Sequence, residues 1–467
     1  MKGKLLILAV IFLHLIAIGQ NNNLSSHKID SLQKLLPGSD ITKQVDILNS
    51  LASHYAPIHF DSSIMYSAQA LRIGTVYGYP VGIGVARYNT GNAYYFKLDM
   101  KNALLSYLSA LRICEENHLT DLSASIYIQM GNINFFVQRS EKAVSYYRNA
   151  INNYKESSNQ KAINDVNIRT YITMFFLGQY PSDSALSYVK KTLEYARMTK
   201  SRLGEAHALL VIGMIYLNPD VISHSSLGIQ YSDSALTILD SLKNLERISV
   251  IHLNLGSYYL ELSYRNIDTT LNYYETKQHY QKGYEAAMEA ESDYLQVICQ
   301  NGLAEIALKK GDYKLTETHL QLVESGLKNF INFSQKLTVS TPDDYFERVF
   351  QYYLMRREKT RFYQIRFDLA MAKGEYRKAI EFQQMNYKSN EEFRAEQEGR
   401  QLELLMAEAE AEKTDQKIRS LAQDNELNQL RLLRTRYILG GIGAGVVIIS
   451  LFLLLFFQRK RWKAEQK

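Results

Sequence analysis

The hydrophobic and small positions in the middle of the chain repeat with a period of about forty residues. Residues 88–95 read YNTGNAYY, and residues 128–135 read IQMGNINF. Twelve residues after the glycine of each segment stands an alanine, followed by an aromatic residue four positions later and another alanine three positions after that. Steps of three and four place side chains on one face of a helix. The pattern therefore predicts amphipathic helices that recur in pairs.

Close packing of antiparallel helices explains why these residue types recur. Gly91 and Gly131 would let a second helix approach, the alanines would do the same for the next pair, and Tyr107 and Tyr147 would fill the remaining space. The small residue, tyrosine and two alanines stand at the positions found in the tetratricopeptide repeat, which the chain resembles most closely over 82–155. The resemblance implies an all-α fold, an α-solenoid of helical hairpins.

Weaker units extend this pattern to about eight between residues 41 and 393. They are marked by Leu51, Tyr55 and Ala70, by Ala185, Tyr188 and Leu193, by Gly213 with Tyr216, by Gly256 with Tyr259, and by turns at Gly311 and Gly374. Insertions are expected around 218–227, 264–273 and 338–345. An unrelated helical bundle is the alternative, but it gives no reason for the repeated spacing of glycine, alanine and aromatic residues.

An uncharged apolar run lies near the carboxyl end. Residues 437–457 contain no charged side chain, and at about 1.5 Å per residue they match the thickness of a bilayer. Backbone amides in lipid must be bonded internally, so this run predicts one transmembrane helix. Arg459, Lys460, Arg461 and Lys463 follow it, as expected of a basic cytoplasmic tail over 458–467.

The first nineteen residues read as an export signal. Lys2 and Lys4 precede an apolar run over 5–18, and Ala17 and Gly19 supply the small residues that a signal peptidase needs. We expect cleavage after Gly19, and an uncleaved anchor is the alternative. Export would place a lead-in over 20–40 and the repeats in the periplasm. The predicted location is the inner membrane, with a single span.

Residues 394–436 are rich in Glu, Gln, Lys, Arg, Leu and Ala, which favour a helix. A heptad-like seam runs through Ile418, Leu421, Asn425, Asn428 and Leu432. Two of these five positions are polar, so a coiled coil and a single solvated stalk helix both remain open. In the apolar run, Gly441 and Gly445 form a G-x-x-x-G pair, which predicts a contact face for a homodimer.

We identify no catalytic, cofactor-binding or metal-binding residues in the sequence. G-x-S-x-G, H-E-x-x-H and P-loop lysine motifs do not occur in the sequence, and His54 and His59 lie five apart, off one helical face. Cys114 and Cys299 are expected as two separate buried thiols. A net charge of +6 over 467 residues does not call for nucleic acid. The sequence predicts a binding protein and not an enzyme.

The resemblance to tetratricopeptide arrays implies a groove lined by the first helix of each unit. The residues expected to face it are Tyr88, Asn92, Tyr95, Phe96, Ile128, Asn132, Phe135 and Phe136. Amides can bond the backbone of an extended peptide while aromatic rings cover its side chains, so the predicted ligand is a peptide or protein. The alternative is that these residues pack against neighbouring repeats.

The order of parts is similar to the sensor halves of signalling proteins common in Bacteroidetes-type bacteria. In those proteins a histidine kinase or a helix-turn-helix DNA-binding domain follows the basic stretch, and residues 401–436 and 458–462 carry the likeness here. The resemblance implies an adaptor or sensor whose output comes from a partner such as a separate histidine kinase or regulator. A truncated sensor half of such a protein and a scaffold for cell-envelope assembly are the alternatives.

Overall fold

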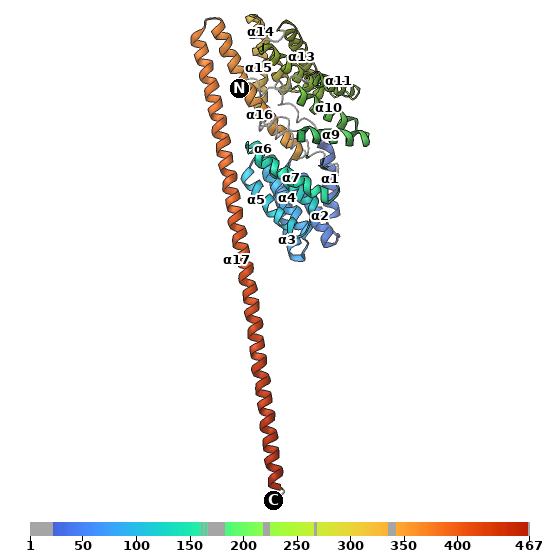
Figure 1. The fold of residues 1–467 in the computed structure, drawn as a ribbon, viewed down its shortest axis with the longest axis vertical. Coiled ribbons are helices and arrows are strands. Elements are labelled where there is room, and N and C mark those ends of the chain that lie inside the picture. The colour runs from blue at the N-terminus through green and yellow to red at the C-terminus, as the bar shows by residue number, and fades with distance from the viewer. Residues whose placement is uncertain are drawn as a thin grey trace. The chain divides into compact units, whose positions relative to one another are not determined.

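A computed structural model describes residues 22–159, 162–163, 166, 183–217, 225–265, 269–334 and 342–465. The described residues form helices and connecting turns without a strand, which confirms the all-α prediction (Figure 1). The predicted export signal over 1–19 lies outside the described residues, as do parts of the three predicted insertions and the side chains of Ala185 and Tyr188.

The helices are α1 (Asn22–Leu35), α2 (Ile41–Tyr55), α3 (Phe60–Tyr77), α4 (Pro80–Phe96), α5 (Met100–Glu116), α6 (Thr120–Phe136), α7 (Ser140–Glu156), α9 (Asp183–Met198), α10 (Arg202–Tyr216), α11 (Ser225–Ser241), α12 (Leu245–Tyr264), α13 (Thr269–Glu289), α14 (Asp293–Lys309), α15 (Tyr313–Ser334), α16 (Pro342–Ala372) and α17 (Tyr376–Glu465). Consecutive helices pack as hairpins: α2 with α3, α4 with α5, α6 with α7, α10 with α11, α12 with α13, and α14 with α15. Each hairpin also contacts the next along much of the chain, for example α5 with α6 and α13 with α14. These stacked hairpins form the solenoid-like array that the sequence predicts.

The turns between helices reverse the chain through one residue in the left-handed region. Leu98 has φ 61°, and the N–H of Asp99 donates to the carbonyl oxygen of Tyr94 at 3.0 Å. Gly311 and Gly374 occupy the equivalent turn positions at φ 75° and 73°, where a residue without a Cβ avoids strain. The sequence prediction of turns at these two glycines is confirmed.

The core is built from the predicted contacts between glycine and tyrosine. Gly91 faces the ring of Tyr107 so closely that a Cβ at Gly91 would lie 2.5 Å from Cδ1 of that ring. Gly131 and Tyr147 repeat the arrangement in the next hairpin. The alanines predicted beside these rings are fully buried: Ala103, Ala110, Ala143 and Ala150. The sequence-based explanation of the repeat spacing is therefore confirmed in these two hairpins.

In a later part of the array one tyrosine ring packs against glycines of two helices. Gly256 packs against Tyr280, which Gly302 contacts as well, so one fully buried ring fills the space between α12, α13 and α14. Tyr259, which marks this unit in the sequence together with Gly256, is only partly buried and stacks on His279 with ring centroids 5.6 Å apart.

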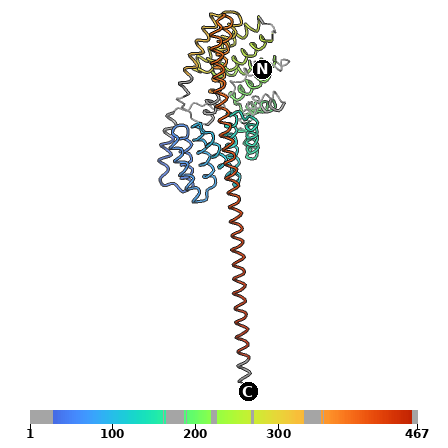
Figure 2. The backbone as a smooth tube through the Cα atoms, turned by 90° about the vertical axis from the view of Figure 1, so that its left-hand side faces the viewer, coloured from blue at the N-terminus to red at the C-terminus, as the bar shows by residue number. Residues whose placement is uncertain are grey.

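Helix α16 links distant parts of the array. It contacts α14 and α15, which directly precede it, and also α4 and α6 from the first hairpins. Figure 1 shows α16 near helices of both the first and the later hairpins, and the tube in Figure 2 shows the same chain turned by 90°. Helix α16 therefore makes long-range contacts with the first hairpins that the stacking of neighbouring hairpins does not require.

The first part of α17 belongs to the same compact unit. Gln401 Nε2 donates to the carbonyl oxygen of Val137 at 2.6 Å, and Leu404 and Ala407 are fully buried. This unit ends at Ala407, whereas the sequence predicts the end of the array at 393 and a stalk from 394 that is either a solvated helix or a coiled coil. The difference arises because the helix-forming composition of 394–436 also contains apolar residues with a partner in the fold.

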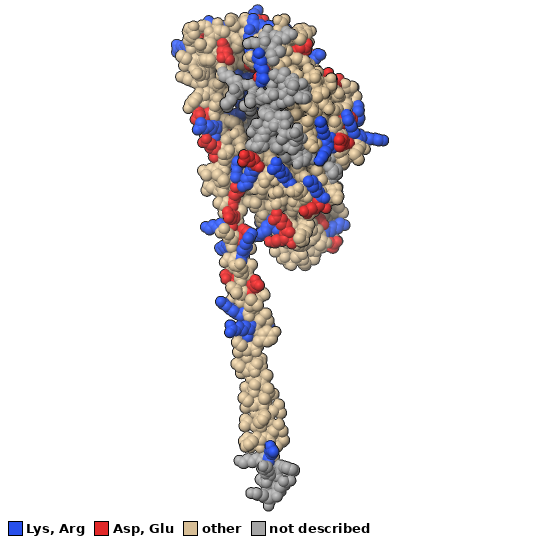
Figure 3. Space-filling view, viewed as in Figure 1, with Lys and Arg blue, Asp and Glu red and all other residues tan. Residues whose placement is uncertain are grey.

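The second unit comprises residues 408–467, and its described part, which ends at Glu465, is the remainder of α17. Among the described helices, α17 alone is long and apolar enough to cross a membrane by length and composition. Figure 3 shows a stretch toward the end of α17 without charged side chains, in contrast to the interspersed acidic and basic residues of the array. The boundaries 437–457 of the membrane span stay a prediction.

Candidate functional site

The predicted groove residues divide into buried and partly exposed positions. Asn92, Tyr95, Asn132, Phe135 and Phe136 are buried, whereas Tyr88, Phe96 and Ile128 are partly exposed. All of them lie on α4 and α6, so these two helices do bring them into neighbouring layers. The five buried side chains face the interior of the array and not an open groove.

Hydrogen bonding explains why the two asparagines are buried. The hydroxyl of Tyr107 donates to Oδ1 of Asn92 at 2.7 Å, and the hydroxyl of Tyr147 donates to Oδ1 of Asn132 at 2.8 Å. A buried hydroxyl needs such a partner, and the asparagine supplies it in each repeat. These amides stabilise the hairpins, which is the packing alternative, and a ligand contact for Asn92 and Asn132 stays a prediction.

The aromatic members of the set are also used internally. The rings of Tyr95 and Phe136 stack with centroids 6.3 Å apart, and the neighbouring rings of Phe135 and Phe136 lie 6.1 Å apart. Tyr95 and Phe136 join α4 to α6, which is the contact between adjacent repeats that the sequence analysis kept as its alternative. A ligand contact for the partly exposed Tyr88, Phe96 and Ile128 stays a prediction.

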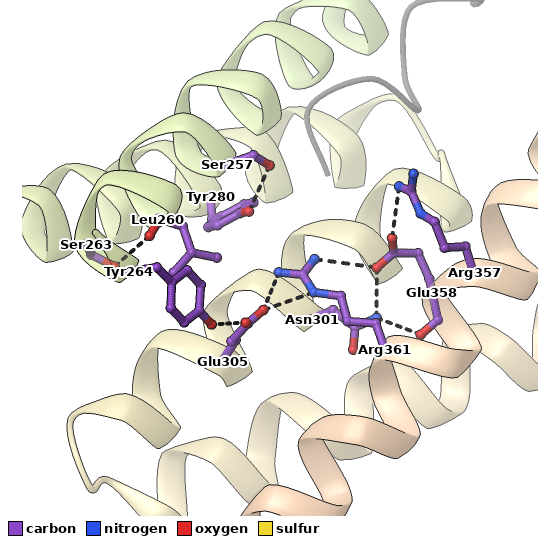
Figure 4. A network of polar contacts seen from close by, with 10 residues as sticks. All are labelled: Ser257, Leu260, Ser263, Tyr264, Tyr280, Asn301, Glu305, Arg357, Glu358 and Arg361. Atoms are coloured by element: carbon purple, nitrogen blue, oxygen red, sulfur yellow. Dashed lines mark hydrogen bonds and ion pairs between the residues drawn. The ribbon is translucent and has the colours of Figure 1, made fainter. Parts of the chain in front are cut away.

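A buried network of charged side chains holds α16 in place (Figure 4). Arg361 on α16 forms ion pairs with Glu305 on α14 at 2.6 Å and with Glu358, one turn away on α16, at 3.5 Å. Nδ2 of Asn301 on α14 donates to the carboxylate of the fully buried Glu358 at 3.0 Å, and the hydroxyl of Tyr264 donates to Glu305. The network joins α12, α14 and α16 through charged hydrogen bonds.

The electrostatic balance of this network depends on Arg361. Burial alone would lower the pKa of the Arg361 guanidinium, but the carboxylates of Glu305 and Glu358 together hold that pKa well above its ordinary value. The guanidinium therefore stays charged and neutralises two carboxylates. We assign this network a structural role, because its charges satisfy one another.

A cavity of about 770 Å³ opens between α15, α16 and α17, beside this network. Its apolar lining includes Met355, Phe362, Tyr363, Phe382 and Met385, and its charged lining includes Glu324, Lys328, Arg356, Lys359 and Arg366. The volume lies within the range of about 300–1,000 Å³ that is typical of ligand sites. Aromatic, methionine and arginine side chains are also the types enriched in protein-binding surfaces.

The cations around the cavity share a small number of carboxylates. Glu324 lies 3.0 Å from Lys328 and 3.6 Å from Arg366, and Glu396 lies 3.5 Å from Arg356 and 2.8 Å from Arg400. Each of these glutamates thus serves two basic side chains. Arg366 also pairs with Glu317. Among the described residues, Lys359 is therefore the lining cation without a carboxylate partner, and the positive charge around the cavity is only partly neutralised.

Sequence reasoning missed this cavity, although α16 carries a signal for it. Tyr352, Met355, Arg356, Lys359, Phe362, Tyr363 and Arg366 recur at steps of three and four. Such spacing places alternating basic and aromatic side chains on one helical face. The cavity also needs α15 and α17 as walls, and no sequence pattern shows that these helices surround that face.

A histidine pair lies elsewhere in the array. Nδ1 of His252 on α12 and Nδ1 of His279 on α13 are 3.1 Å apart. Burial lowers the pKa of both imidazoles to about 4, and Lys282 adds to the effect. Both rings are therefore neutral near pH 7 and are joined by one N–H···N bond. In the part of the chain that the structure describes, no group of three or more His, Cys, Asp or Glu side chains is arranged to hold a metal ion.

Two further predictions concern the two cysteines and the G-x-x-x-G pair of the apolar run. Cys114 and Cys299 are free and buried, as expected of separate thiols, and burial raises the pKa of Cys114 to about 12. Gly441 and Gly445 lie on α17, and a Cβ at either position would meet no described atom within 4 Å. A dimer contact at these glycines stays a prediction.

Comparison with solved structures finds helical repeat proteins at low identity. Aspartyl phosphate phosphatase F from Bacillus subtilis matches over 80% of this chain and 96% of its own, at 13% identity and a TM-score of 0.47. A signal transduction ATPase with a tetratricopeptide repeat sensor, from Pyrococcus horikoshii, matches over 59% of this chain and 42% of its own, at 17% identity and a TM-score of 0.47.

A third similar structure is the apo form of the quorum sensor NprR from B. thuringiensis, which matches over 72% of this chain and 99% of its own at 14% identity and a TM-score of 0.36. No protein-family model matches the sequence, and no curated protein matches it. The three solved proteins are tetratricopeptide-like repeat proteins. At these scores the description of the fold rests on the packing of the chain itself.

Proposed function

We propose that the chain is a membrane-anchored repeat protein that binds a peptide or protein in the cavity between α15, α16 and α17. The observation that carries this proposal is the composition of the cavity, in which aromatic and methionine side chains lie beside partly neutralised cations. An apolar floor with a charged rim suits a partner that buries apolar side chains and pairs polar groups at the edge.

The position of the cavity supports a role in sensing. Phe382 and Met385 line it from α17, and the same helix contains the apolar run over 437–457. A ligand in the cavity would therefore contact the helix that we propose to enter the membrane. A conformational change needs an element with two arrangements, and the contact of Leu404 and Ala407 with the array is the one we propose to change.

The membrane anchor rests on the apolar run and the basic residues after it. Arg459 begins that basic stretch, as expected of the side that stays in the cytoplasm. The export signal over 1–19 would place the array in the periplasm, with the span in the inner membrane. The output would then come from a separate histidine kinase or regulator, or from a homodimer that forms through Gly441 and Gly445.

Photo-crosslinking in intact membranes tests the proposal. A photoreactive phenylalanine analogue in place of Tyr363, which lines the cavity, is expected to give a discrete adduct with a peptide or protein. The matched control is the same analogue in place of Tyr274, an exposed residue of α13. Recovery of the protein in the membrane fraction, lost on deletion of 437–457, is expected in parallel. Equal adducts from both positions, or a soluble full-length protein, would count against the proposal.

A further inference from the structure

We propose that the ligand of this cavity is an acidic peptide segment, with carboxylates that alternate with apolar side chains. The inference rests on the proposed function and specifies the chemistry of the same site. It is argued from the arrangement of cations and rings along α16 and from Lys359, which has no carboxylate partner among the described residues.

Lys359 is the cation that most clearly lacks a partner. It lines the cavity, and among the residues that the structure describes no carboxylate forms an ion pair with it. Its ammonium lies over the ring of Tyr363, with 5.9 Å to the centroid. A ligand carboxylate would supply the missing negative charge at this position.

The two arginines contact aromatic rings in addition to their ion pairs with Glu396 for Arg356 and with Glu317 and Glu324 for Arg366. The guanidinium of Arg356 lies 5.5 Å from the ring centroid of Tyr352, and its Nε donates to the hydroxyl of that tyrosine at 3.0 Å. Arg366 lies over the rings of Phe362 and Phe382, at 5.3 Å and 5.9 Å. Rings that fix a guanidinium reduce the entropy lost when an anion binds. The site is therefore partly organised before a ligand arrives.

The spacing of the cations favours a peptide over a single-headed lipid. Arg356 and Arg366 are ten residues apart on α16, which corresponds to about 15 Å along a helix. An extended peptide advances about 3.3 Å per residue, so about five residues span that distance. A peptide can place separate carboxylates near both ends, whereas a fatty acid carries one. Met355 and Phe362 lie on the same face and offer apolar contacts between them.

Fluorescence anisotropy with the full-length protein in nanodiscs tests the inference. The probes are three labelled, amide-capped pentapeptides, Asp-Leu-Phe-Glu-Leu, Ser-Leu-Phe-Ser-Leu and Lys-Leu-Phe-Lys-Leu, with lauric acid as a competitor. We expect the acidic peptide to bind at least tenfold more tightly than the neutral one, with affinity that falls as salt rises. Lys359→Glu is expected to weaken the acidic peptide at least tenfold, and Lys277→Glu, at an exposed lysine of α13, to leave it unchanged.

The outcomes separate this inference from the proposed function. Neutral and acidic peptides that bind equally, or an acidic peptide that Lys359→Glu does not weaken, would overturn the acidic specificity while leaving a peptide site. Displacement by lauric acid with no peptide preference would assign the cavity to a lipid and overturn the inference. Absence of binding by all three peptides, together with no crosslink at Tyr363, would overturn both proposals. Circular dichroism of Lys359→Glu checks that the variant keeps its helices.

Discussion

Replacement of Arg361 by methionine is expected to lower the free energy of unfolding by about 3–5 kcal/mol. The substitution leaves the carboxylates of Glu305 and Glu358 without their shared cation, and Glu358 is fully buried. A buried charge that loses its partner retains the cost of its desolvation and gains nothing in return. Urea-induced unfolding followed by circular dichroism measures the change. The matched control is Arg377→Met, at a side chain that is 96% exposed, and we expect it to change stability by less than about 0.5 kcal/mol.

A second variant distinguishes lost charge pairing from lost packing. Arg361→Met combined with Glu305→Gln and Glu358→Gln removes the three charges while it keeps similar side-chain volumes. This triple variant is expected to be more stable than Arg361→Met alone, because neither buried carboxylate then lacks its cation. Arg357 loses its ion pair with Glu358, but its side chain is 25% exposed and remains accessible to solvent. A triple variant that is less stable than the single variant would contradict the electrostatic explanation. A single variant with the stability of the wild type would contradict the buried network.

Tyr280→Ala is expected to cost about 3–5 kcal/mol, the range for deletion of a large buried aromatic side chain. Its ring is fully buried and contacts Gly256 and Gly302, and its hydroxyl lies 2.9 Å from that of Ser257. Two glycines cannot fill the space that the ring leaves, so a cavity would remain between α12, α13 and α14. Thermal unfolding followed by circular dichroism measures the effect.

The control for this prediction lies on the same helix. Tyr274 is 58% exposed, and Tyr274→Ala is expected to leave the transition almost unchanged. Tyr280→Phe keeps the ring and removes only the hydroxyl, so its cost is expected to be about 1 kcal/mol. Similar losses for Tyr280→Ala and Tyr274→Ala would show that the ring is not a central packing residue of these hairpins.

Local packing was the part of the fold that the sequence could predict. Gly91 with Tyr107 and Gly131 with Tyr147 repeat at a fixed spacing, because each hairpin needs the same close approach of two helices. The turns at Gly311 and Gly374 were predictable for a similar reason, since each requires a positive φ. Contacts that recur between neighbouring helices therefore appear as a periodic pattern of residue types in the sequence.

Long-range contacts produce no periodic pattern in the sequence. The return of α16 to α4 and α6, and the bond from Gln401 to Val137, join residues more than two hundred positions apart. They also explain why residues up to Ala407 belong to the array although their composition is that of a solvated helix. The packing role of the asparagines could not be chosen from the sequence for a related reason. Asn92 is equally suited to a ligand or to a tyrosine hydroxyl, and only the position of Tyr107 decides between them.

The cavity could not be predicted from the sequence for a similar reason. The alternation of basic and aromatic residues on α16 is visible in the sequence, but a charged aromatic face on a helix is compatible with solvent, with packing or with a ligand. Phe382 and Met385 complete the cavity from α17. Their position relative to α16 depends on the turn at Gly374 and on contacts such as the ion pair of Arg356 with Glu396, and no spacing rule relates these features to one another.

The cavity and the proposed signal both require that α16 and the first part of α17 stay attached to the array. Hydrogen exchange of the full-length protein in nanodiscs, read by mass spectrometry, tests this directly. We predict that amides of 354–371 and 397–407 exchange as slowly as those of α6 and α14, and that Arg361→Met accelerates exchange in 354–371. Fast exchange of both segments in the wild-type protein, at the rate of a solvated helix, would contradict the account.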